Sequence, residues 1–118
     1  MSKTILSVED SSFERKVIRN VVEDEGYELV EAENAEEGLE KYDDEKPDLV
    51  LLDIRLPDKD GIQVLKELHE EYNNPQVVMV SIVREEETIE EAKELGALEY
   101  VEKPVTEEKL LPVIQDVL

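Results

Sequence analysis

The stretch LVLLD (residues 49–53) decides the fold of this chain. Four apolar residues follow the break at Pro47-Asp48 without interruption, and the run ends in an acid. An unbroken apolar run indicates a strand that is covered on both faces, whereas alternation indicates one face in water. The runs TILSV (4–8) and VVMVS (77–81) have the same apolar character. The pattern therefore predicts a parallel sheet between two layers of helices.

The remaining elements fill the intervals between these strands. Helical periodicity and turn residues divide the chain into five strands that alternate with five helices. Short connections and right-handed crossovers then favour a doubly wound α/β fold. In such folds ligands bind outside the carboxyl ends of the strands. Strands are expected at 4–8, 27–32, 49–53, 77–81 and 99–102, and helices at 12–25, 34–44, 62–72, 86–95 and 106–118.

The first expected helix has both a start signal and an apolar stripe. Ser11 followed by Glu14 has the form of a capping box, in which each side chain bonds a backbone N–H of the other residue. Gly26 follows the helix as its expected C′ residue. The apolar side chains expected on one stripe are Phe13, Val17, Ile18, Val21 and Val22.

Length and composition limit the class of protein. The chain has 118 residues, 40% of them hydrophobic, which suits one domain over residues 1–118 with a sizeable core. It contains no cysteine, so disulfides and thiolate metal sites are excluded. No apolar run approaches the ~20 residues that span a bilayer, and the N-terminus lacks a signal-peptide pattern. We therefore expect a cytoplasmic protein without a membrane partner.

The charge balance is strongly acidic. Asp and Glu number 33 against 13 Lys and Arg, which gives a formal net charge of -20. Such a surface repels phosphate backbones and anionic lipids, so direct nucleic-acid binding is not expected. The same acidity also suits a protein of a high-salt environment, where screening relieves self-repulsion. The composition leaves open whether this is an ordinary solvated surface or an adaptation to salt.

Reactive side chains stand at the expected carboxyl edge of the sheet. Glu9 and Asp10 follow the first strand, Asp53 ends the third, Ser81 ends the fourth and Lys103 follows the fifth. Taken singly, each has a structural explanation, such as a helix-start acid, a backbone-bonded serine or a solvated lysine. Together, three carboxylates at one place need a cation between them, and oxygen ligands with few protein groups suit Mg²⁺. Their joint placement favours a site.

These residues carry a resemblance to a known family over essentially the whole chain. The chain resembles the receiver domains of two-component response regulators. The motifs are the acidic pair Glu9-Asp10, LLDIRLPDKDG (51–61), VVMVS (77–81) and GALEYVEKP (96–104), in this order and at these spacings. The resemblance implies a flavodoxin-like (βα)5 fold with the strand order 2-1-3-4-5 known for receivers. It also implies a signalling switch rather than a turnover enzyme.

The resemblance assigns roles to the acids. Asp53 would be the nucleophile that accepts a phosphoryl group from a phosphohistidine, a step that needs alignment and charge neutralisation. Asp10, Asp53 and the backbone carbonyl of Arg55 would hold Mg²⁺ directly. Glu9, the longer acid of the pair, would reach the metal through a water.

Further roles are implied for residues at the other strand ends. Lys103 would pair with Asp53 at rest and with a phosphoryl oxygen afterwards, and the Ser81 hydroxyl would bond another. As Ser81 moves, the Tyr100 ring would turn inward and change the face formed by 86–95, 99–102 and 106–118. Pro104 is a candidate for a cis peptide bond after Lys103.

The residue after Ser81 departs from the family pattern. Receivers usually carry a small residue there, and this chain has Ile82. A β-branched side chain beside the pocket would restrict entry of water or of a phosphatase, and the hypothesis is a long-lived aspartyl phosphate. Arg55 and Val83 flank the same pocket and are expected to tune the same step.

The resemblance also implies partners. The phosphoryl donor would be a sensor histidine kinase or a histidine phosphotransfer protein, and the downstream protein effector is not identified by the sequence. We expect a monomer, or a weak dimer on phosphorylation. Arg15, Lys16 and Arg19 form either a kinase-docking face or ordinary solvent-facing charges. A chemotaxis-type regulator, a phosphorelay intermediate and a receiver excised from a longer regulator all remain open.

Two other classes share parts of the pattern. A phosphatase of the haloacid dehalogenase type also has a nucleophilic Asp at a strand end, but it needs a second acid where this chain has Arg55. A flavodoxin-like FMN carrier would need a phosphate-binding loop after the first strand, whereas this loop is acidic.

Overall fold

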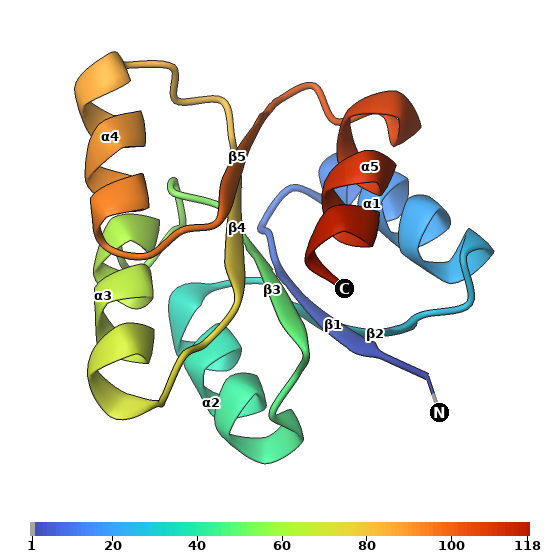
Figure 1. Ribbon diagram of the computed structural model, residues 1–118, viewed down its shortest axis with the longest axis horizontal. Helices are drawn as coiled ribbons and strands as arrows, with labels where there is room; N and C mark the ends of the chain where they lie inside the picture. The colour runs from blue at the N-terminus through green and yellow to red at the C-terminus, as the bar shows by residue number, and fades with distance from the viewer. Residues whose placement is uncertain (1) are drawn as a thin grey trace.

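Five parallel strands form one sheet in the order β2-β1-β3-β4-β5 (Figure 1). The computed structural model describes residues 2–118. The fold and strand order confirm the doubly wound, flavodoxin-like prediction. The strands are β1 Thr4–Val8, β2 Glu28–Ala32, β3 Leu49–Leu52, β4 Val77–Ser81 and β5 Glu99–Glu102.

Helices cover both faces of this sheet. In Figure 1, α1 and α5 lie on one side and α2, α3 and α4 on the other. Helix and strand ends match the predicted limits or differ from them by one residue, which is the usual uncertainty of an element's boundary. Within the described residues, no helix has the length and apolar character needed to cross a membrane. The helices are α1 Ser12–Asp24, α2 Ala35–Glu45, α3 Gly61–Glu71, α4 Glu86–Glu94 and α5 Glu107–Val117.

The core lies on both faces of β3, which explains its unbroken apolar run. Leu49 and Leu51 pack in a cluster with residues of α1 and α5. Val50 and Leu52 pack in a second cluster with residues of α2, α3 and α4. All four side chains are fully buried. Because successive side chains point to opposite faces, each must be apolar when both faces are covered.

The predicted apolar stripe of α1 is wrong at one position. Ile18, Val21 and Val22 are buried, but Phe13 is 70% exposed. With 3.6 residues per turn, Phe13 lies roughly 130° around the helix from the middle of those three residues. Its side chain therefore points away from the sheet.

Only half of the predicted capping box forms. Ser11 Oγ accepts a hydrogen bond of 3.3 Å from the Glu14 N–H, as expected for an N-cap. The Ser11 N–H, however, donates to Oε2 of Glu9 at 3.1 Å and not to Glu14. Glu9, which precedes the helix, thus accepts the bond that the capping box assigns to Glu14. This bond links the start of α1 to the acidic pair.

Candidate functional site

The acids that follow β1 and β3 meet at the carboxyl edge of the sheet. β1 and β3 pair in parallel, and the Asp53 N–H continues the ladder by donating to the Val8 carbonyl at 3.1 Å. One carboxylate oxygen each from Glu9, Asp10 and Asp53 lies within 4.8 Å of the others. Glu9 and Asp53 are buried, whereas Asp10 is exposed. The structure therefore brings the three predicted carboxylates together with an opening on the Asp10 side.

Lys103 completes this group from the loop after β5. Its Nζ lies 2.7 Å from Oε1 of Glu9 and 2.9 Å from Oδ2 of Asp53. The Lys103 side chain is only 12% exposed. The backbone N–H of Lys103 donates to the Ser81 carbonyl at 2.9 Å. The Lys103–Pro104 peptide bond is cis. One ammonium thus bridges two buried carboxylates at the end of β3.

The electrostatics of the site show an excess of negative charge. Burial raises the pKa of Glu9 to about 7. The hydrogen bond from Lys103 lowers this pKa, and the negative charge of Asp53 raises it further. Burial lowers the pKa of Lys103, but its contacts with Glu9 and Asp53 outweigh this and raise the pKa above its usual value. When all three carboxylates are ionised, the single ammonium of Lys103 balances one of their charges and leaves two negative charges uncompensated. A small divalent cation with oxygen ligands fits this donor set.

Comparison with known proteins decides the family. Residues 5–115 match the family model of the response regulator receiver domain. The chain belongs to this family. It is thus a receiver domain of two-component signalling, related to CheY-like response regulators.

Relatives of this receiver match most or all of its length. The chemotaxis protein CheY of Halobacterium salinarum is 36% identical over 118 residues, which cover 100% of this chain and 98% of the relative. Sporulation initiation phosphotransferase F of Bacillus subtilis is 38% identical over 104 residues, 88% of this chain and 84% of the relative. A chain in the CheX-CheY-BeF3-Mg complex from Borrelia burgdorferi superposes on this receiver with a TM-score of 0.93 at 30% identity. The match covers 98% of this receiver and 88% of that chain.

In this receiver, the residues predicted to switch are linked through Val83. The buried Ser81 Oγ accepts a hydrogen bond from the Val83 N–H at 3.2 Å. The Tyr100 hydroxyl donates to the Val83 carbonyl at 2.5 Å. The Tyr100 ring is half-buried against the core in this conformation, and its inward turn on switching stays a prediction. Ile82, between the two bonded residues, is 57% exposed and so shields the site only in part.

The loop after β3 contains a site residue that sequence reasoning missed. A Cβ on Gly61 would lie 2.0 Å from the Asp53 carbonyl oxygen, so only glycine fits at the start of α3. The Gly61 N–H donates to the Ile54 carbonyl at 2.7 Å, and the Arg55 N–H lies 3.4 Å from Oδ1 of Asp53. In the sequence, Asp60-Gly61 just before the helix expected at 62–72 indicates a turn, but the letters alone do not reveal the close approach to Asp53.

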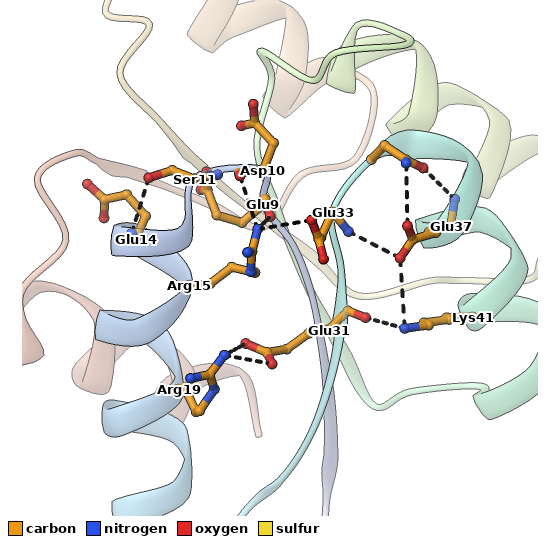
Figure 2. A network of polar contacts seen from close by, with 11 residues as sticks. Glu9, Asp10, Ser11, Glu14, Arg15, Arg19, Glu31, Glu33, Glu37 and Lys41 are labelled. Atoms are coloured by element: carbon orange, nitrogen blue, oxygen red, sulfur yellow. Dashed lines mark hydrogen bonds and ion pairs between the residues drawn. The ribbon is translucent and has the colours of Figure 1, made fainter.

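The basic residues of α1 are not a uniform docking face. Nη2 of Arg19 lies 3.0 Å from both carboxylate oxygens of Glu31 on β2 (Figure 2). Arg15 turns toward the main chain of the acidic pair, and Lys16 alone of the three is exposed. Internal oxygen acceptors thus already bind both arginines, and whether this face docks a kinase stays a prediction.

Proposed function

We propose that this receiver accepts a phosphoryl group on the Asp53 carboxylate from the phosphohistidine of a sensor kinase or a histidine phosphotransfer protein. An Asp53 oxygen forms the new bond to phosphorus, and the bond from phosphorus to the histidine nitrogen breaks. The observation that carries the proposal is the buried Asp53 at the end of β3, with the Lys103 ammonium 2.9 Å away and two further acids beside it.

The surrounding residues fit the demands of this transfer. Asp10, Asp53 and the carbonyl of Arg55 would hold Mg²⁺, with Glu9 reaching it through a water. When bound, the ion would neutralise charge on the phosphoryl oxygens. Lys103 would exchange its contact with Asp53 for one with a phosphoryl oxygen, and the Ser81 hydroxyl would donate to another.

The output would be a change of the face formed by α4, β5 and α5. A move of the Ser81 Oγ toward a phosphoryl oxygen would weaken its bond from the Val83 N–H, and the Val83 carbonyl also accepts from the Tyr100 hydroxyl. Both contacts would therefore change together, which biases the equilibrium between two packings. The CheX-CheY complex named above supports a protein as the reader of the signal.

We propose that residues 1–118 act as one domain that signals through its phosphorylated state and does not turn over an external substrate. A phosphorelay intermediate is the second candidate, since a phosphotransferase is among the relatives. In either setting Asp53 carries the phosphoryl group.

Substitution of the acceptor tests the proposal. With a small phosphodonor and Mg²⁺, the wild type is expected to take up one phosphoryl group and Asp53→Asn none. Asp44→Asn, which removes an exposed acid of α2, is the matched control and should label as the wild type does. Undiminished labelling of Asp53→Asn would remove the assignment.

A further inference from the structure

Arg15 binds the main chain of the residues that carry the acidic pair. Its Nη1 donates to the Glu9 carbonyl and to the Asp10 carbonyl, both at 3.0 Å (Figure 2). The same nitrogen lies 3.9 Å from Oε1 of Glu33, in the loop between β2 and α2. The Arg15 side chain itself is only 15% exposed, although Asp10 and Glu33 lie at the surface.

The position of this arginine opposes the local preference of the helix. Arg15 is the fourth residue of α1, close to the positive end of the helix dipole, where acids are favoured and cations are not. Long side chains in helices point back toward the N-terminus, which directs the guanidinium over the preceding loop. Residues that break a local rule are expected at functional sites. Here the contacts with two carbonyl oxygens offset the unfavourable position.

The Asp10 carboxylate has no such support of its own. Among residues 2–118 it makes no side-chain hydrogen bond or ion pair, and in Figure 2 it points away from Arg15. Its place beside Glu9 and Asp53 therefore depends on the main chain beneath it. That main chain is held by the Glu9 N–H, which donates to the Ala32 carbonyl at 2.9 Å, and by the two bonds from Arg15.

We propose that Arg15 is a positioning residue of the metal and phosphoryl site, which fixes the main chain of Glu9 and Asp10 from the side opposite the carboxylates. This inference rests on the proposed function, because it assumes that these acids bind Mg²⁺. Arg15 places its charge on the carbonyl side of the loop and leaves the carboxylate side free. A planar guanidinium that donates to two oxygens is not replaced by the point charge of a lysine.

The sign of the effect separates positioning from simple charge. Removal of a cation near a metal site favours a divalent ion by electrostatics alone, so Arg15→Gln would then bind Mg²⁺ more tightly. Loss of positioning has the opposite effect, and removal of an outer partner of a metal site weakens binding by about tenfold or more. Arg19→Gln removes the same charge from the same helix, but Arg19 bonds Glu31 and does not contact the acidic loop.

Calorimetric titration of the full chain with MgCl₂ tests the inference, together with amide hydrogen exchange in the absence of metal. Arg15→Gln is expected to weaken Mg²⁺ binding by about tenfold and to speed exchange of the Glu9 and Ser11 amides. Arg19→Gln should bind as the wild type does. Arg15→Lys should fall between, and it decides by the same criterion if Arg15→Gln does not fold.

Three results overturn different claims. If the wild type binds Mg²⁺ and the Arg15 variants bind it equally well or more tightly, the positioning role is wrong and the proposed function stands. If the wild type itself does not bind Mg²⁺, the proposed function fails. Faster exchange throughout the chain, without a selective change at residues 9–11, would show that Arg15 supports only the fold.

Discussion

Lys103 reaches from the loop after β5 to place its ammonium 2.9 Å from the Asp53 carboxylate at the end of β3. The two residues are 50 positions apart in the sequence, and the order β3-β4-β5 brings their strands to the same edge. The same ammonium lies 2.7 Å from Glu9. Lys103 thus holds together Asp53 and one acid of the pair that follows β1.

Loss of this cation is expected to destabilise the metal-free protein. Lys103→Met leaves two buried carboxylates without a compensating cation, and breaking a buried ion pair in this way costs about 3 kcal/mol. Urea unfolding measures the loss, and Mg²⁺ should recover part of it because a cation then returns to the site. Lys66→Met, at an exposed position of α3, is the control. Equal unfolding free energies for Lys103→Met and the wild type would contradict this account of the site.

Gly61 is expected to be essential for the geometry of Asp53. In Gly61→Ala the new methyl group meets the Asp53 carbonyl at 2.0 Å, so the main chain must shift, at a cost of about 1–3 kcal/mol. Because Asp53 moves with it, uptake of a phosphoryl group should fall sharply. Gly26→Ala is the control: its φ of 83° makes alanine unfavourable by about 1–2 kcal/mol, but nothing lies within 4 Å of the added methyl group. Normal labelling of Gly61→Ala would show that the close contact is not required.

Ile82 is expected to slow decay of the aspartyl phosphate. Its side chain follows Ser81 and is 57% exposed, so it covers the site only partly, and Ile82→Ala should speed hydrolysis several-fold. The decay of labelled protein after removal of the donor gives the rate. Leu98→Ala, at another exposed apolar residue, should decay as the wild type does. Indistinguishable rates for Ile82→Ala and the wild type would end the hypothesis.

Tyr72 provides a pH test of the contact between α2 and α3. Its hydroxyl donates to Oδ1 of Asp43 at 2.8 Å, and this bond raises the pKa of Tyr72 to about 12. In the unfolded chain the phenol loses its proton near pH 10, so between pH 10 and 12 the folded state binds more protons. The contribution of the Tyr72–Asp43 bond to the free energy of unfolding is therefore fully present below pH 10 and is lost as the pH rises toward 12.

Phenolate absorbance during alkaline titration measures this directly. Asp43→Asn should lower the pKa of Tyr72, so that the phenol titrates at a lower pH. It should also reduce the stability that the wild type loses between pH 10 and 12. Tyr72→Phe identifies the late step in the wild type. Identical titration curves for the wild type and Asp43→Asn would show that the bond does not form in solution.

The sequence was sufficient for the strands and for the edge at which the acids gather. LVLL in β3 is apolar because helices cover both faces of the strand, and an unbroken apolar run of this kind predicts such burial from the sequence alone. Strand order came from the family resemblance, since periodicity alone does not order strands. Asp53 and Lys103 could be placed at one edge because each follows a strand.

Contacts that depend on the direction of a side chain could not be predicted. Phe13 fits an apolar stripe by spacing, but its rotation around the helix leaves it exposed. Arg15 reads as a surface charge until the fold places two carbonyl groups within its reach. Asp58 shows the same limit, because its carboxylate accepts bonds from Ala35 and Glu36 at the start of α2, far away in the sequence.

Mapping the phosphoryl group tests directly whether Asp53 is the metal-dependent acceptor. One sample is incubated with a small phosphodonor and Mg²⁺, and a second with the same donor and EDTA. Mass spectrometry of the peptides should find one phosphoryl group, on Asp53, in the sample with Mg²⁺ and little or none in the sample with EDTA. A phosphoryl group on another residue, or equal labelling without the metal, would contradict the assignment of Asp53 and its acidic neighbours.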